Sequence, residues 1–167
     1  MTRHDSMRGW FAYELYQHMK TNKNIWLIVG DLGYKVFDKI REEFPNRFIN
    51  TGAAEQAMIG IACGLALEGK IVFVYSITTF LIYRPFETIR NYIDHEKIPV
   101  KLIGSGRDKD YLHDGFSHDS TDVSQLFGHS KFFKNIQACF PQEKEDIPDI
   151  VSHMIEINKP FFLSLRR

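Results

Sequence analysis

Residues 51–75 read TGAAEQAMIGIACGLALEGKIVFVY, and this stretch decides the fold. Met58, Ile61, Ala62 and Leu65 recur at helical spacing, which predicts a helix over residues 53–68. Gly69 follows at the position where a glycine commonly ends a helix. The uninterrupted apolar run 71–75 then predicts a strand buried on both faces, as is typical of a parallel sheet.

The same alternation of helix and strand extends toward both ends of the chain. Apolar runs predict further strands at residues 25–29, 47–50, 100–104, 135–140 and 161–165. Helical spacing predicts helices around residues 7–19, 37–44, 85–93, 123–127 and 147–157. This alternation predicts one α/β domain over residues 1–167, a doubly wound, mainly parallel sheet with helices on both faces. Ligands of such sheets bind beyond the carboxyl ends of the strands.

The composition excludes several classes of protein. The 167 residues carry 21 lysines and arginines against 21 aspartates and glutamates, and this zero net charge argues against nucleic-acid binding. No apolar run approaches the roughly 20 residues of a membrane-spanning helix. Cys63 and Cys139 are too few for a disulfide framework and indicate a reducing compartment. We therefore expect a cytoplasmic domain with no nucleic-acid or membrane partner.

One acidic side chain, Glu55, lies in the first turn of the otherwise apolar helix 53–68. At this position a carboxylate stabilises the positive end of the helix dipole. Alternatively, it is a partly desolvated carboxyl that shares a proton with a ligand nitrogen. The residues alone leave both interpretations open.

Aromatic residues recur every three positions after the strand 71–75. Phe80, Tyr83 and Phe86 have the spacing of core residues on one helix face. The alternative is a platform at the strand end on which a flat ring stacks.

The loop 113–119, HDGFSHD, contains residue types that bind metal ions. Hard and borderline ligands in one flexible loop, without a second cluster, make a poor metal site, so we expect no metal ligands in this chain. Because the loop follows a predicted strand, it is interpreted as substrate-facing, with a solvated polar loop as the alternative.

Four segments together resemble one family. Residues 50–69 resemble the Gly-x-x-Glu-Gln helix of transketolase-type thiamine diphosphate enzymes, and Thr79-Phe80 with residues 84–91 resemble the family's next motif. The turn 30–33, GDLG, and the loop 113–118 resemble its Ala-Asp-Leu-Gly and Asp-Gly-Pro-Thr-His segments. Because the four occur in the family's order and spacing, the resemblance implies a transketolase-like pyrimidine-binding domain spanning nearly the whole chain.

The resemblance implies how a cofactor is held. Glu55 matches the catalytic glutamate that contacts N1′ of the aminopyrimidine of thiamine diphosphate, and a carboxyl there favours the imino tautomer that takes the proton from C2 of the thiazolium. Phe80, Tyr83 and Phe86 match the aromatic pocket around the pyrimidine, with Tyr83 as the stacking residue.

Three further residues match positions that bind substrate. Asp114 matches a residue that contacts a substrate hydroxyl. His118 matches a catalytic histidine near the donor carbonyl, suited to polarising it or moving protons at neutral pH. Arg166 matches a phosphate-binding arginine.

Phe116 in place of proline and Ser117 in place of threonine imply a reshaped donor loop. Gly106 stands where transketolases commonly have a histidine, so the resemblance does not carry over their usual sugar-phosphate specificity.

Nothing in the sequence resembles the family's diphosphate-binding domain. No Gly-Asp-Gly followed by a metal-binding asparagine occurs, so we expect a separate N-terminal subunit to hold the diphosphate and Mg²⁺. This chain would then be the C-terminal subunit of a split enzyme, and the family implies a heterotetramer with two copies of each chain.

The implied reaction transfers a two-carbon ketol unit from a ketose to an aldose or keto-sugar acceptor, with a sugar or sugar phosphate as substrate. Two alternatives remain open. One is a non-catalytic scaffold or regulatory subunit, and the other is a subunit of an α-ketoacid decarboxylating thiamine diphosphate enzyme.

Overall fold

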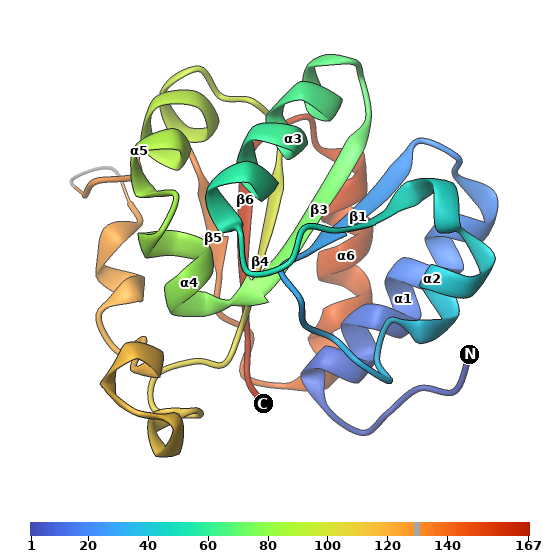
Figure 1. The fold of residues 1–167 in the computed structure, drawn as a ribbon, viewed down its shortest axis with the longest axis horizontal. Helices are drawn as coiled ribbons and strands as arrows, with labels where there is room; N and C mark the ends of the chain where they lie inside the picture. The colour runs from blue at the N-terminus through green and yellow to red at the C-terminus, as the bar shows by residue number, and fades with distance from the viewer. Residues whose placement is uncertain (129–130) are drawn as a thin grey trace.

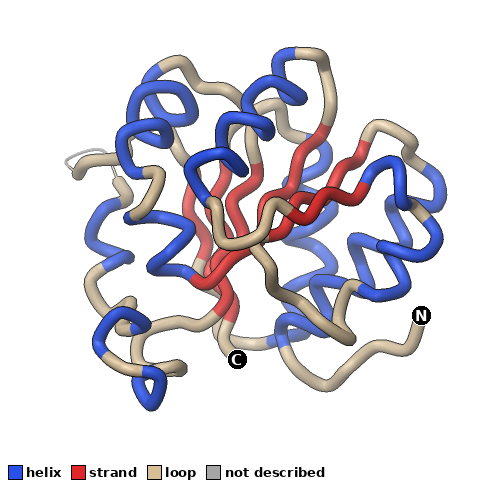
Figure 2. Tube along the Cα trace, viewed as in Figure 1, coloured by secondary structure: helices blue, strands red, loops and turns tan. Residues whose placement is uncertain are grey.

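The computed structural model describes residues 1–128 and 131–167 and has a six-stranded sheet at its centre (Figures 1 and 2). The strands lie in the order β2-β1-β3-β4-β6-β5, and every neighbouring pair is parallel. Their bounds are Ile25–Val29 (β1), Phe48–Asn50 (β2), Ile71–Ile77 (β3), Lys101–Ser105 (β4), Gln137–Cys139 (β5) and Phe161–Leu165 (β6). The α/β class and the parallel sheet predicted from the sequence are confirmed.

The chain changes direction across the sheet between β1 and β3. From β1 it runs outward to β2 and then returns to β3 on the other side of β1. Val29 pairs with both Asn50 and Tyr75, so β1, β2 and β3 are in register where β1 ends. A switch point of this kind leaves a crevice beyond the carboxyl ends of the strands, which is where doubly wound folds bind ligands.

Helices cover both faces of the sheet (Figure 1). One face carries α1 (Met7–Thr21), α2 (Asp38–Glu43) and α6 (Ile147–Glu156). The other carries α3 (Glu55–Leu67), α4 (Thr78–Tyr83), α5 (Phe86–Thr88) and the π-helical segment Ile89–His95. Short 3-10 turns complete the described structure at Pro45–Arg47, Leu112–Asp114, Phe116–His118, Val123–Leu126 and Lys144–Asp146.

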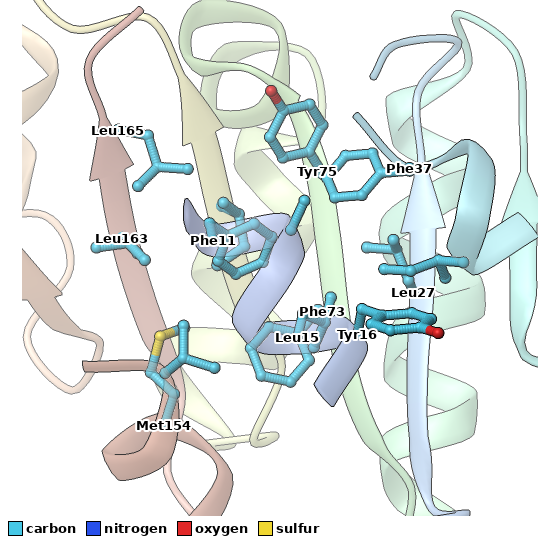
Figure 3. Packing of buried hydrophobic residues seen from close by; sticks show 14 of the residues in the cluster. Phe11, Leu15, Tyr16, Leu27, Phe37, Phe73, Tyr75, Met154, Leu163 and Leu165 are labelled. Carbon is cyan, nitrogen blue, oxygen red and sulfur yellow. The ribbon is translucent and has the colours of Figure 1, made fainter. Parts of the chain in front are cut away.

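Each face of the sheet has its own hydrophobic cluster. On the first face, Figure 3 shows Phe11 and Leu15 of α1 with Met154 of α6, packed against Phe73 and Leu163 of the sheet. The second cluster joins α3 and the helices after β3 to the opposite side of the same strands; it includes Met58, Ile59, Val74, Ile82, Leu102 and Phe162. Alternate strand residues therefore enter opposite clusters, which explains the uninterrupted apolar runs in the sequence.

The helix predicted at residues 85–93 is one of several consecutive segments. Pro85 separates α4 from α5, and the π-helical segment continues to His95. The carboxylate of Asp94 in that segment accepts from the backbone N–H groups of Asn135 (2.7 Å) and Ile136 (3.0 Å), so the segment is held against the residues just before β5.

Among the described residues, no helix has the length and apolar character needed to cross a membrane.

Candidate active site at the carboxyl ends of β1 and β3

Glu55 lies at the switch point of the sheet, at the start of α3. The turn before it is held by Asn50 at the end of β2, whose Oδ1 accepts from the backbone N–H of Gly52 (2.9 Å) and of Asp31 (3.1 Å). Gly52 takes a positive φ of 68°, which glycine adopts without strain. The helix begins at Glu55, so its carboxylate is near the positive end of the helix dipole while the residue is only 2 % exposed.

A serine of β3 holds the Glu55 carboxylate, and a glycine after β1 leaves room for it. Ser76 of β3 donates its Oγ hydrogen to Oε1 at 2.9 Å. Gly30, directly after β1, leaves the space these atoms need, because a Cβ there would lie 3.1 Å from Ser76 Oγ and 3.3 Å from Glu55 Oε1. A buried carboxylate is costly unless it is hydrogen-bonded, and these contacts account for one of its oxygens.

The second oxygen of Glu55 faces a flat cation. Arg84 Nη1 lies 2.6 Å from Glu55 Oε2, and the guanidinium carbon lies 3.9 Å from the centre of the Phe80 ring. The Arg84 side chain is 44 % exposed, whereas that of Glu55 is 1 % exposed. We use the name Glu55 site for Glu55, Ser76, Gly30, Phe80 and Arg84. Its geometry pairs a buried carboxylate with a planar N–H donor lying on an aromatic face.

His118 also contacts the Phe80 ring. The two rings are 4.9 Å apart between centroids and meet edge to face. Thr79, next to Phe80 in α4, donates its Oγ1 hydrogen to the carbonyl of Ser117 at 2.8 Å. The histidine loop is therefore anchored to the helix that carries Phe80, and the structure brings the predicted residues Glu55, Phe80 and His118 into one neighbourhood.

Asp114 lies in the same loop but contacts none of these groups. It ends the 3-10 turn Leu112–Asp114, and its Oδ2 is 3.4 Å from His113 Nε2. Gly115 follows with a φ of 103° and reverses the chain before the turn that carries His118. The carboxylate of Asp114 is exposed.

Tyr83 borders a neighbouring cavity. Its hydroxyl donates to Asp122 Oδ1 at 2.7 Å, and partial burial together with this hydrogen bond raises the pKa of Tyr83. The cavity has a volume of about 360 Å³, and its lining also includes Phe116, Asp119 and Gln125. The hydroxyl of Tyr83 is thus committed to Asp122 rather than to Glu55.

Phe86 points into the hydrophobic layer. Its ring lies 5.2 Å from that of Phe133 and 6.1 Å from that of Phe132, measured between centroids. Of the three predicted aromatic residues, Phe80 thus lies in the Glu55 site, Tyr83 beside it and Phe86 in the core-packing position that the sequence also allowed.

Arg166 follows β6 and pairs with acidic residues of the loop after β4. Its Nη2 is 3.4 Å from Asp108 Oδ2, and its Nη1 is 3.7 Å from Asp110 Oδ1. The guanidinium is half-exposed at the carboxyl edge of the sheet. Arg166 therefore lies at the carboxyl edge of the sheet, where ligands of this fold bind, and its guanidinium is paired with the carboxylates of Asp108 and Asp110.

Sequence reasoning missed two residues of the Glu55 site, Ser76 and Arg84. A small polar residue inside the apolar strand 71–77 was a usable signal for Ser76. For Arg84 the usable signal was its position four residues after Phe80, which places the two side chains on one helix face. Among the described residues, no cluster of three or more His, Cys, Asp or Glu side chains could hold a metal ion.

Comparison with known proteins identifies the family of this chain. The family model described as "Transketolase, pyrimidine binding domain" matches residues 5–167. The chain belongs to the transketolase pyrimidine-binding domain family. The resemblance of the four sequence segments is therefore confirmed.

Relatives of the family include proteins encoded as separate sections. The chain is 30 % identical over 162 residues to the "Putative transketolase C-terminal section" of Methanocaldococcus jannaschii, covering 96 % of this chain and 50 % of that one. It is 32 % identical over 124 residues to one subunit of the apulose-4-phosphate transketolase of Actinobacillus succinogenes, covering 74 % and 39 %. The chain thus spans about half the length, or less, of these curated relatives.

A solved structure of this family supports the same assignment. The chain superposes with a TM-score of 0.81 on "Split gene transketolase, inactive beta4 tetramer", at 28 % identity and with 97 % of this chain and 51 % of that one covered. Transketolase from Leishmania mexicana gives the same TM-score at 19 % identity, with 99 % of this chain and 26 % of that one covered, a likeness of fold alone.

Proposed function

We propose that this chain is the pyrimidine-binding subunit of a two-subunit, thiamine diphosphate-dependent transketolase-like enzyme of carbohydrate metabolism in the cytoplasm. The enzyme would transfer a two-carbon ketol unit from a ketose to an aldose or keto-sugar acceptor. The observation that carries the proposal is the buried Glu55 carboxylate, which faces a planar N–H donor stacked on Phe80. Relatives whose names describe a transketolase section or subunit support it.

The Glu55 site has the chemistry that an aminopyrimidine requires. The guanidinium of Arg84 is flat, donates N–H groups from its edge and lies on an aromatic face. An aminopyrimidine has the same three properties, so the contacts that hold Arg84 are those that would hold the cofactor's ring. We infer that Glu55 and Phe80 bind the pyrimidine, with Tyr83 turning toward it from the adjoining cavity and Phe86 supporting it from the core.

Thiamine diphosphate, when bound, supplies the electron sink needed to cleave a ketose next to its carbonyl. Glu55 would hold a proton shared with the ring nitrogen, in a site where burial strengthens each hydrogen bond. His118, edge-on to Phe80, would polarise the donor carbonyl or move a proton at neutral pH. Asp114 would accept a hydrogen bond from a substrate hydroxyl, and Arg166 would bind a substrate phosphate by exchanging its carboxylate partners.

Relatives named as a transketolase C-terminal section and as a transketolase subunit support a partner for this chain. The sequence offers no motif for holding a diphosphate and its Mg²⁺, so a diphosphate-binding N-terminal subunit would supply both, in a heterotetramer with two copies of each chain.

The exposed side of α3 has the shape for such an interface. A Cβ placed at Gly60 or Gly64 would meet nothing within 4 Å, and Ile61 and Leu67 expose apolar surface beside them. Another backbone can approach closely at such glycines, which supports subunit contact along α3 next to Glu55.

Co-expression of this chain with the diphosphate-binding subunit from the same organism tests the proposal. We expect ketol transfer, measured with a panel of ketose donors and aldose acceptors, only from the assembled pair supplied with thiamine diphosphate and Mg²⁺. An assembled pair that binds no thiamine diphosphate would overturn the proposal. A pair that releases CO2 from α-ketoacids but transfers no ketol unit would replace it with the decarboxylating function.

A further inference from the structure

Arg84 occupies the space directly in front of the Glu55 carboxylate. It follows the last residue of α4, and its Nη1 contacts Glu55 Oε2 at 2.6 Å while its guanidinium carbon lies 3.9 Å above the Phe80 ring. Glu55 Oε1 is already taken by Ser76 at 2.9 Å. The only polar contact that the described residues give the Arg84 side chain is the one to Glu55.

A flat ring cannot lie on this face of Phe80 and contact Glu55 while the guanidinium does so. Arg84 and an aminopyrimidine need the same aromatic face and the same carboxylate oxygen. The two are therefore competitors, and the free chain supplies its own occupant of the site.

The contact between Arg84 and Glu55 can break without disturbing the rest of the site. Glu55 is anchored by buried groups, whereas the Arg84 side chain is almost half exposed. Its guanidinium can leave for water by side-chain rotation alone, and exposed side chains change rotamer within nanoseconds. Water solvates a released guanidinium, so displacement costs the ion pair and the stacking but leaves no buried charge on Arg84.

We propose that Arg84 is a gate on the Glu55 site, which occupies the place of the aminopyrimidine in the free subunit and is displaced when the cofactor binds. This inference rests on the proposed function. A charge-assisted hydrogen bond together with cation–π stacking reduces the affinity of the free chain for the pyrimidine by roughly ten- to a hundredfold. Contacts to the diphosphate in the partner subunit then supply the free energy that displaces Arg84. Arg84 thereby biases cofactor binding toward the assembled enzyme.

Calorimetric titration of the free full-length chain with 4-amino-5-(hydroxymethyl)-2-methylpyrimidine, the bare pyrimidine of thiamine, tests the gate. We expect Arg84→Met to bind this compound roughly ten- to a hundredfold more tightly than the wild type. Arg90→Met is the matched control, because Arg90 is exposed and its Nη1 donates to Asn91 Oδ1 at 3.2 Å, away from Glu55. The double variant Arg84→Met/Glu55→Gln should lose the gain.

Equal affinity of the wild type and Arg84→Met would overturn the gate, as would a gain that survives in the double variant. Arg84→Lys keeps a charge that can pair with Glu55 but cannot lie flat on Phe80, so it should show a smaller gain than Arg84→Met. This second variant decides the question if Arg84→Met does not fold by circular dichroism, since a lysine variant that binds like the wild type contradicts the proposal.

Nitrogen-15 NMR of the arginine side chains gives an independent measurement on the ligand-free chain. The Nη signals of Arg84 should be shifted and slowed in rotation in the wild type, and Glu55→Gln should abolish this. Both measurements use the free chain, whereas the proposed function is tested on the assembled pair, so failure of the gate and failure of the proposed function are distinguishable.

Discussion

Two buried charges lie at opposite ends of the same sheet, and they are satisfied in different ways. Glu55, beyond the carboxyl end of β1, pairs with the side chain of Arg84, which reaches water. Lys101, at the amino end of β4, is 1 % exposed and donates to the backbone carbonyls of Ile157 (2.8 Å) and Lys159 (2.6 Å). A partner that is part of the backbone cannot leave, whereas a half-exposed side chain can.

The comparison separates a charge with fixed partners from one with an exchangeable partner. Lys101 binds the carbonyl of Ile157 directly after α6, where the last carbonyls of a helix lack partners, and both of its hydrogen bonds go to backbone oxygens. Glu55 has one fixed partner in Ser76 and one exchangeable partner in Arg84. Both charges are buried, so burial does not distinguish them; the exchangeable partner of Glu55 at the carboxyl edge of the sheet is the feature that its proposed role requires.

The largest effect is expected at Glu55. Glu55→Ala should lower turnover by the assembled pair by about 10²–10⁴-fold or abolish it, because a positioned acid–base group contributes on this scale. The fold should persist, as measured by circular dichroism and thermal unfolding. Glu156→Gln, which changes an exposed glutamate at the far end of α6, is the control and should leave turnover unchanged. Near-normal turnover in Glu55→Ala would remove the mechanism.

At Lys101 the expected effect is on stability, with a defined pH dependence. Burial lowers the pKa of Lys101 from 10.5 to about 8. Between these values the unfolded chain binds more protons than the folded one, so the free energy of unfolding rises as the pH increases from about 8 to 10.5. The rise due to this group is at most about 3 kcal/mol.

Urea denaturation at several pH values measures this contribution. Lys101→Met should flatten the rise relative to the wild type without changing turnover of the assembled pair. Lys159→Met, at an exposed lysine, should keep the wild-type slope. Identical slopes in the wild type and Lys101→Met would show that Lys101 is not desolvated as described.

A smaller effect is expected when the Glu55 carboxylate is crowded. Gly30→Ala places a Cβ 3.1 Å from Ser76 Oγ and 3.3 Å from Glu55 Oε1, closer than ordinary contact. The chain should lose about 1 kcal/mol of stability, and the assembled pair should bind thiamine diphosphate more weakly. If calorimetry shows unchanged affinity for thiamine diphosphate, the Glu55 carboxylate can shift to make room for the added Cβ without loss of binding.

The smallest effect is expected at the fixed partner. Ser76→Ala removes one hydrogen bond to Glu55, worth about 0.5–1.5 kcal/mol, and should weaken thiamine diphosphate binding by the assembled pair about two- to tenfold. Ser164→Ala removes an equally buried serine that accepts from Arg107 Nε at 3.2 Å, and it should not alter binding. Equal losses in the two variants would indicate a general effect of core serines.

The sequence predicted the fold because the signals for it are local. The apolar runs of β1, β3, β4 and β6 and the helical spacing of α3 each lie within one element. Glu55 was found in the same way, as a single carboxyl in the first turn of an apolar helix.

The aromatic residues show where local spacing stops being informative. Phe80, Tyr83 and Phe86 would share a face only if one helix continued through them. In the structure α4 ends at Tyr83 and α5 begins after Pro85. The Phe86 side chain therefore does not share a helix face with Phe80 and packs against Phe133. The Arg84–Glu55 pair joins residues 29 positions apart, and only the tertiary structure, which brings the end of α4 to the first residue of α3, reveals it.

Titration of thiamine diphosphate with Mg²⁺ into the chain, with and without its diphosphate-binding partner, tests the central claim most directly. The claim is that the Glu55 site receives the cofactor's pyrimidine as half of a shared active site. It predicts binding heat from the assembled pair, no comparable heat from the free chain, and loss of the heat in a pair carrying Glu55→Ala. Binding of equal strength with and without the partner, or in the pair with Glu55→Ala, would contradict it.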